Sequence, residues 1–145
     1  MLEVVGIDHI YIAVSDLTRS ERFYDVVMKA LAFRRNEFHL EGDRHIQYYN
    51  RHFGYVLRPT RSGIVHDPYS PGLHHLCFRV DSVADVQSVA ADLRSAGIDA
   101  TEPALYPDYA PDYWATFFTD PDGIRLEITN YRQERRDRHD KWGDT

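Results

Sequence analysis

Two histidines and one glutamate in this sequence can act together as metal ligands. His9 and His75 lie in two segments, 6–14 and 72–80, which repeat a glycine, a histidine and a final valine at the same offsets. Glu127 lies in a third segment of alternating character. Two imidazoles and one carboxylate form a facial ligand set that suits a divalent transition metal and leaves coordination positions open for substrate. Zinc, manganese, nickel, cobalt and iron(II) all remain candidates, since the residue types do not choose between them.

These segments are predicted to be strands, because apolar side chains alternate with other residues along each of them. The apolar faces consist of Ile10, Ile12 and Val14, of Leu76, Phe78 and Val80, and of Ile124, Leu126 and Ile128. His9, His75 and Glu127 fall on the opposite, open faces. Three strands can therefore deliver ligands that lie far apart in the sequence to one site.

The elements around the two histidine strands occur twice in the same order. A helix is predicted at 17–31, where Ser15-Asp16 offers an N-cap and Thr18 with Glu21 has the spacing of a capping box. A second helix is predicted after Ser82. Strands are predicted at 5–14, 33–40, 45–50 and 55–59, and again at 72–80, 98–103, 113–119 and 124–130. The predicted fold is therefore α+β, with two tandem βαβββ units whose uncovered sheet faces favour pairing of the units.

The boundaries of these units follow from turn-forming and charged segments. We expect a single domain over residues 1–131, made of a unit at 5–60, a linker at 61–71 and a unit at 72–131. Residues 132–145 form a tail dense in charges of both signs. A solvated or frayed terminus is the simpler interpretation, and a docking segment anchored by Trp142 is the alternative.

The bulk composition excludes two classes of partner. The chain of 145 residues carries a net charge of −6, so no electrostatic attraction to nucleic acid or to an anionic membrane is expected. No apolar run reaches the length of a membrane span, and the N-terminus lacks the pattern of a signal peptide. The single cysteine, Cys77, excludes an internal disulfide and fits a reducing compartment, so a cytoplasmic protein is predicted.

The ligand segments resemble those of the vicinal oxygen chelate superfamily, which includes glyoxalase I, fosfomycin-resistance enzymes, bleomycin-resistance proteins and extradiol dioxygenases. The resemblance covers about residues 5–131. Its most specific stretches are Asp8-His9-Ile10, Gly72-Leu73-His74-His75-Leu76 and the hairpin from Phe118 to Glu127. His9 and His75 match the two histidine ligand positions of that superfamily, and Glu127 matches its glutamate ligand.

This resemblance implies a fold and a class of chemistry. The paired units are expected to close a curved mixed sheet around a metal cavity, where the metal chelates vicinal oxygens of a small oxygenated substrate. Lyase, isomerase, transferase and dioxygenase reactions all occur in the superfamily. A homodimer is also implied, in which His9 of one subunit faces His75 and Glu127 of its mate.

One residue departs from the glyoxalase I pattern, which has a fourth ligand in the first unit. The internal repeat aligns Gly54–Arg58 with Gly123–Glu127, which predicts Arg58 at that position. A guanidinium has no acceptor atom and cannot ligate a metal, so glutathione-dependent isomerisation is disfavoured. Arg58 is instead interpreted either as a clamp for a carboxylate or phosphonate of the substrate, or as a member of a surface ion pair.

Other residues near the predicted site carry a structural and a functional interpretation. These are His74, expected on the other face from His75; His66, in the linker; Cys77, on the face of His75; and Tyr106, Tyr109, Tyr113 and Trp114. Structural roles are favoured for the histidines and the cysteine. The aromatic residues either line a ligand pocket or pack where units meet.

Three functions are compatible with these observations. The first is a metal-dependent enzyme, which the complete set of His9, His75 and Glu127 favours. The second is a metal-free dimer that sequesters a drug or another ligand, as bleomycin-resistance proteins do. The third is a structural or regulatory dimer that retains the ligands without turnover. Metal content separates the first from the second.

Overall fold

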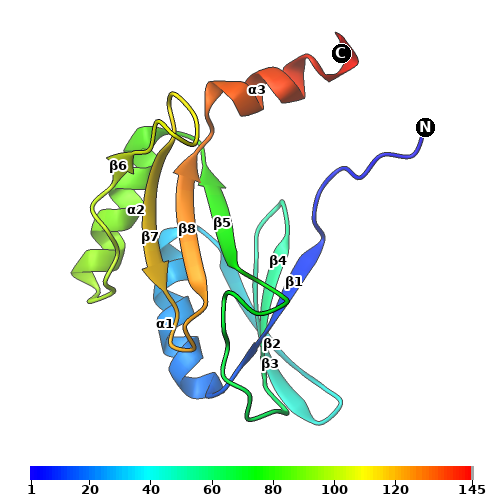
Figure 1. Ribbon diagram of the computed structural model, residues 1–145. Coiled ribbons are helices and arrows are strands. Elements are labelled where there is room, and N and C mark those ends of the chain that lie inside the picture. The colour runs from blue at the N-terminus through cyan, green and yellow to red at the C-terminus, as the bar shows by residue number, and fades with distance from the viewer. Residues whose placement is uncertain (145) are drawn as a thin grey trace. The chain divides into compact units, whose positions relative to one another are not determined.

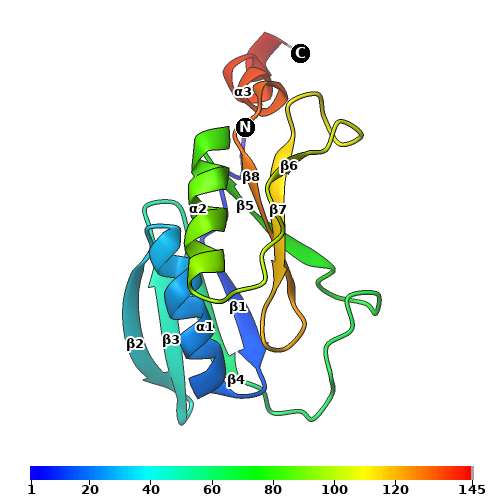
Figure 2. The same ribbon diagram turned by 90° about the vertical axis from the view of Figure 1, so that its left-hand side faces the viewer.

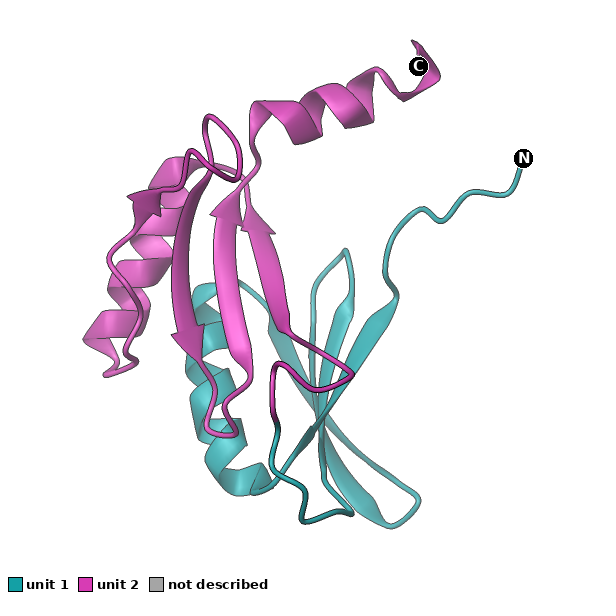
Figure 3. Ribbon diagram, in the orientation of Figure 1, with its two compact units in different colours: residues 1–66 teal, residues 67–145 magenta. Residues whose placement is uncertain are grey.

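The computed structural model describes residues 1–144 and divides the chain into two compact units, residues 1–66 and 67–145 (Figure 3). Each unit contains a strand, a helix and three further strands, which confirms the predicted α+β fold of two tandem βαβββ units. Within residues 1–144, no helix is both long and apolar enough to cross a membrane.

In the first unit, one helix covers one face of a four-stranded sheet (Figure 1). The elements are β1 (His9–Val14), α1 (Leu17–Ala30), β2 (Arg34–Leu40), β3 (Asp43–Tyr49) and β4 (Gly54–Pro59), and the strand order is β1-β4-β3-β2. The first and last strands run parallel and the others antiparallel. Val14, Val27 and Leu57 are fully buried in this unit, so the apolar face of β1 lies in the core as the alternation predicts.

The second unit repeats this arrangement, and Figure 2 shows α2 along one face of its sheet. The elements are β5 (His75–Val80), α2 (Val83–Ser95), β6 (Ala104–Leu105), β7 (Trp114–Thr119) and β8 (Arg125–Asn130), in the sheet order β5-β8-β7-β6. Helix α2 begins with a complete capping box between Ser82 and Asp85. Its side chains Val86 and Leu93 are fully buried. The opposite face of β5, β8 and β7 is therefore the face that α2 does not cover.

Two predicted elements of this unit have different bounds. No strand forms at 98–103; the edge strand is β6, at Ala104–Leu105. The Ile98 N–H bonds to Leu93 at the end of α2, and within 98–103 the Thr101 N–H bonds to Phe117 of β7 without forming a continuous ladder. The tail forms helix α3 (Gln133–Asp140) and a short 3-10 helix, η1 (Trp142–Asp144), in which Trp142 is 63% exposed.

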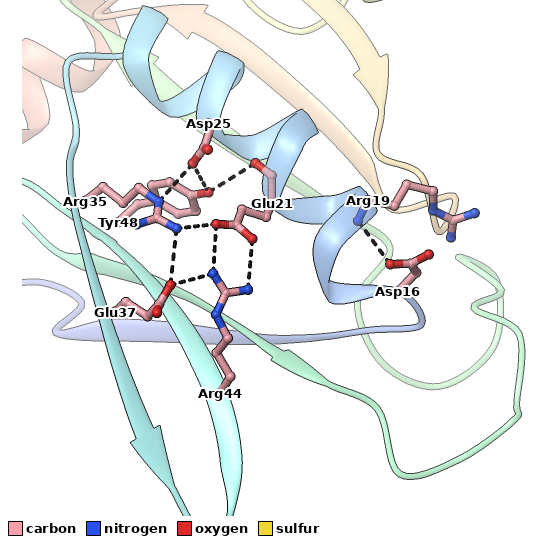
Figure 4. A network of polar contacts seen from close by, with 8 residues as sticks. All are labelled: Asp16, Arg19, Glu21, Asp25, Arg35, Glu37, Arg44 and Tyr48. Carbon is pink, nitrogen blue, oxygen red and sulfur yellow. Dashed lines mark hydrogen bonds and ion pairs between the residues drawn. The ribbon is translucent and has the colours of Figure 1, made fainter.

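A network of ion pairs fastens α1 to β2 and β3 (Figure 4). Glu21 accepts hydrogen bonds from both Arg35 and Arg44, and Arg44 also bonds to Glu37. The N-cap of α1 is Asp16, which accepts from the Arg19 N–H. The predicted capping box with Thr18 is therefore wrong, because the helix already starts at Leu17 and the Glu21 carboxylate is bonded to the guanidinium groups.

Candidate functional site

The open face of the second sheet is built from two cross-strand rows of side chains over β7, β8 and β5, which lie side by side in Figure 1. Residues in register on neighbouring strands point to the same face of a sheet. One row consists of Phe117, Glu127 and Cys77, and the next consists of Thr119, Arg125 and His75. A carboxylate and an imidazole therefore stand on adjacent rows of one surface.

Glu127 is a buried carboxylate within this surface, since only 4% of the residue is exposed. Its Oε2 atom accepts hydrogen bonds from the Tyr113 hydroxyl and, at 3.2 Å, from the Cys77 thiol. Its Oε1 atom lies 3.8 Å from Nε2 of His75. Among residues 1–144, no Arg or Lys forms an ion pair with Glu127. One oxygen is thus held by neutral donors while the other faces the imidazole.

The two donors to Glu127 keep their protons at neutral pH. Desolvation, followed by the charge of Glu127, holds the pKa of the Cys77 thiol well above its usual range. Cys77 as a residue is exposed, but its sulfur atom points to the carboxylate. Desolvation and the hydrogen bond to Glu127 also raise the pKa of Tyr113. The buried Glu127 carboxyl group therefore has two neutral hydrogen-bond donors at one of its oxygens.

Each predicted histidine ligand has its Nδ1 atom paired with the side chain of the preceding residue. Nδ1 of His9 lies 2.6 Å from Oδ1 of Asp8, and Nδ1 of His75 lies 2.8 Å from Nδ1 of His74. A partner at one ring nitrogen fixes the tautomer and leaves the other nitrogen for a metal. The Asp8 carboxylate can only accept, so it favours a proton on Nδ1 of His9 and leaves Nε2 of His9 as the ligand atom. Between His74 and His75 one ring donates to the other, and Nε2 of His75 is free for a metal when the His75 ring is the donor.

The second unit brings two of the three predicted ligands together, and the third lies in the first unit. His9 opens β1 beside a polar pocket of about 310 Å³, which is also lined by Asp8, Tyr11, Gln47 and His52. In the part of the chain that the structure describes, no three His, Cys, Asp or Glu side chains gather into one metal-binding cluster. The pair of His75 and Glu127 is observed, and the complete set of three stays a prediction.

A pocket of about 720 Å³ opens on the ligand face of the second unit. It is lined by His74, His75, Asp99, Thr101, Tyr109, Tyr113, Phe117, Phe118, Thr119, Arg125, Leu126 and Glu127. Tyr109 and Tyr113 line it, which agrees with the first of their two interpretations, whereas Tyr106 is not a lining residue and stacks on Tyr109 at 5.5 Å between ring centroids. The pocket has the size and the mixture of aromatic and polar groups typical of small-molecule sites.

His74 does not point away from the site as expected. Strand β5 begins at His75, so His74 precedes the ladder and is not bound by its alternation. Its ring lies 5.0 Å from that of His75 and 5.2 Å from that of Tyr69, and it lines the pocket. His74 therefore contacts the ring of His75 directly.

The predicted equivalence of Arg58 with Glu127 is wrong by two residues. His9 pairs with Gly54, while His75 pairs with Arg125. The counterpart of Glu127 on the ladder is therefore Val56, which pairs with Tyr11. The reason lies in the hairpin before β8, where Asp120 accepts the Ile124 N–H and keeps that residue in the turn. A valine side chain has no donor atom for a metal, so Val56 cannot supply the fourth ligand of the glyoxalase I pattern.

Arg58 forms an ion pair, as the second of its two interpretations predicts. Its Nη2 atom donates to Oδ2 of Asp43 at 2.6 Å, and Arg61 donates to the same oxygen. Hydrogen bonding by Arg61 is the largest cause of the lowered pKa of Asp43. The role of Arg58 as a clamp for a substrate anion stays a prediction.

Arg125 is a pocket residue that the sequence interpretation did not single out. The alternation along 124–130 places Arg125 on the same face as Glu127, and this pattern could have identified it from the sequence. It stands between Thr119 and His75 in the sheet.

Comparisons with known proteins agree with this fold. The family model described as the Glyoxalase/Bleomycin resistance protein/Dioxygenase superfamily matches residues 6–128. YaeR of Escherichia coli K12 is 30% identical over 134 residues, which cover 88% of this chain and 98% of YaeR. A glyoxylase/bleomycin resistance protein/dioxygenase domain from Frankia sp. EAN1pec superposes with a TM-score of 0.74 at 26% identity, covering 90% of this chain and 100% of that domain.

The fosfomycin resistance protein FosX of Listeria monocytogenes is similar in fold, with a TM-score of 0.65. The match covers 92% of this chain and 99% of FosX. At 16% identity this likeness concerns the fold alone.

Proposed function

Because the chain belongs to the glyoxalase/bleomycin resistance protein/dioxygenase superfamily, we propose that it is a divalent-metal-dependent enzyme acting on a small oxygenated substrate. His9, His75 and Glu127 are the proposed metal ligands. The observation that carries this proposal is the pairing of the buried Glu127 with His75 in the wall of a pocket.

A cation bound at this pair would give the buried Glu127 carboxylate a positively charged partner. A buried carboxylate normally has a cationic partner or coordinates a metal. Within residues 1–144, the hydrogen-bond donors to Glu127 are the hydroxyl of Tyr113 and the thiol of Cys77, and both bond to Oε2. Oε1 remains directed toward His75, so a metal between them would receive one carboxylate oxygen and one imidazole nitrogen.

The residues around the ligands have positioning roles in this proposal. Tyr113 and Cys77 hold the Glu127 carboxylate in one orientation. His74 and Asp8 hold the Nδ1 atoms of the two histidines. Such partners orient metal ligands and raise their affinity for the ion. A bound divalent metal would supply Lewis-acid polarisation of substrate oxygens and stabilise negative charge as it develops.

We propose further that the complete site forms in a homodimer. His9 belongs to the first unit, while His75 and Glu127 belong to the second. In this arrangement, His9 of one subunit completes the pair of its partner.

Elemental analysis of protein purified without chelator tests the metal dependence. Near-stoichiometric zinc, manganese, nickel, cobalt or iron is expected in the wild type and its loss is expected in His75→Ala. His139→Ala is the matched control, because His139 is an exposed histidine of the same unit that does not line the pocket. Metal-free wild-type protein, even after reconstitution with each ion, would contradict the proposal.

A second function is favoured by the aromatic wall of the pocket, which suits ligand capture without turnover. Tyr109, Tyr113 and Phe117 offer flat apolar surface inside a volume of about 720 Å³. A metal-free dimer that sequesters a small aromatic compound would use this wall and leave Glu127 as a hydrogen-bond acceptor. Unchanged ligand affinity in the presence of a chelator would favour this function over the enzyme.

A further inference from the structure

Arg125 is a cation on the pocket surface that has only neutral partners. Its Nη1 atom donates to the Tyr69 hydroxyl at 3.2 Å, and its guanidinium carbon lies 5.1 Å from the centroid of that ring. Over residues 1–144, no carboxylate forms an ion pair with Arg125; Asp99 lines the same pocket without reaching it. An arginine held by an aromatic ring keeps its full charge for another anion.

The position of Arg125 relates this charge to the proposed ligands. Arg125 pairs with His75 on β5 and lies two residues before Glu127 on the same face of β8. On its other side stands Thr119 of β7, which also lines the pocket. This row therefore places a threonine and a cationic arginine beside His75, one of the proposed metal ligands.

The neighbouring row gives the pocket an aromatic end. Phe117 stands opposite Glu127 in the ladder. Tyr113 bonds to that carboxylate and packs edge-to-face against Tyr109, with 5.2 Å between the ring centroids. These three rings line the pocket on the side of the Glu127 row. The polar row and the aromatic row are adjacent, so a ligand of one-ring size can touch both.

We propose that this pocket selects a small aromatic acid, with Arg125 and Thr119 binding its carboxylate and the rings of Tyr109, Tyr113 and Phe117 packing against its ring. This inference rests on the proposed function for one point, namely that an oxygen next to the carboxylate reaches the metal held by His75 and Glu127. A guanidinium pairs with a carboxylate through parallel charge-assisted hydrogen bonds, and ring contacts add affinity beyond the buried area.

Three related compounds separate the two halves of this inference. Mandelate carries a phenyl ring, a hydroxyl and a carboxylate; lactate lacks the ring; and 1-phenylethane-1,2-diol lacks the charge. Calorimetric titration into manganese-loaded protein is expected to give mandelate about tenfold higher affinity than either relative, because each lacks one recognised group.

Arg125→Gln then identifies the residue that binds the charge. Mandelate affinity is expected to fall about tenfold in this variant, with no change for the diol, and Arg125→Lys is expected to recover part of the loss. Arg79→Gln is the matched control. Arg79 is an arginine of β5 on the same face, but its guanidinium stacks on Tyr131 at 4.1 Å and it does not line the pocket.

The outcomes separate this inference from the proposed function. Equal effects of Arg125→Gln and Arg79→Gln, equal affinities for mandelate and lactate, or no binding of mandelate at millimolar concentration would overturn the inference even if metal binds stoichiometrically. If the wild type retains no metal but still binds mandelate in an Arg125-dependent way, the selection of an aromatic acid stands and the metal-dependent function fails.

Discussion

Cys77 and Glu127 face each other across the β5–β8 ladder, and the thiol donates to Oε2 of the carboxylate at 3.2 Å. Tyr113, which directly precedes β7, donates to the same oxygen. Both donors therefore hold one oxygen, which leaves Oε1 toward His75. The orientation of a single carboxylate depends on two side chains that do not themselves ligate a metal.

Removing either donor is expected to weaken metal binding while the unit still folds. Tyr113→Phe and Cys77→Ala should each lower the affinity for manganese or zinc by about 10- to 100-fold, the usual effect of losing a partner of a metal ligand. The affinity is measured by competition with a chromophoric chelator. Tyr106→Phe is the control, because Tyr106 stacks on Tyr109 and does not itself line the pocket. An unchanged affinity in both donor variants would show that Glu127 is oriented by the backbone alone.

His74 provides a second test of ligand orientation. Its Nδ1 atom lies 2.8 Å from Nδ1 of His75, so His74→Ala frees the His75 ring to rotate or to change tautomer. Metal affinity is expected to fall about tenfold, whereas loss of a ligand in His75→Ala should abolish binding. Nuclear magnetic resonance of the imidazole nitrogens reports the tautomer of His75 in each protein. The same tautomer and affinity in His74→Ala would remove His74 from the site.

A mixed dimer tests whether two subunits share the site. When His9→Ala and Glu127→Ala subunits are combined, a shared arrangement gives one intact site and one doubly impaired site in each heterodimer. Half of the wild-type metal content is then expected in the purified heterodimer, although each parent homodimer binds none. If each site lies within one subunit, every site in the heterodimer lacks one ligand, and metal should be absent there too.

The network around Glu21 predicts how the stability of the fold depends on pH. The hydrogen bond from Arg44 is the largest cause that lowers the pKa of Glu21, with Arg35 contributing as well. A folded-state pKa below the unfolded value stabilises the protein above the ordinary glutamate range, and this contribution is lost as the pH falls through the folded value.

Glu21→Gln should therefore lower the free energy of unfolding at pH 7 by about 1 kcal/mol, the net contribution of a typical intramolecular hydrogen bond. The difference from the wild type should shrink as the pH falls below about 4.5, the ordinary value. Urea unfolding at several pH values measures it. Glu102→Gln is the control, since Glu102 pairs with Arg94 at the exposed surface and should change little. A pH-independent difference would mean that Glu21 acts through packing alone.

The fold was accessible from the sequence because its signals are local. Alternation in the histidine strands predicts the buried side chains Val14 and Phe78, and Ser82 predicts the start of α2. The same alternation placed His75 and Glu127 on the open face, and the family resemblance identified them as candidate metal ligands. Period-two patterns fix faces well, because a shift of one residue would expose the core.

The parts that could not be predicted depend on where a strand joins the ladder. Asp120 holds Ile124 in the turn, so β8 starts two residues later than the repeat suggests and Val56 replaces Arg58 as the counterpart of Glu127. A shift of two residues keeps every side chain on its own face and leaves no trace in the hydrophobic pattern. His74 escaped prediction for a related reason, because it lies just before the first residue of β5.

The place of β8 between β5 and β7 also bears on the biosynthesis of the protein. Cys77 and Glu127 are 50 residues apart, so the ladder that unites His75 with Glu127 cannot form until the ribosome has released the last strand. Pairing of distant segments is the slow step in folding. The proposed metal site at this pair therefore cannot assemble on a nascent chain that still lacks β8.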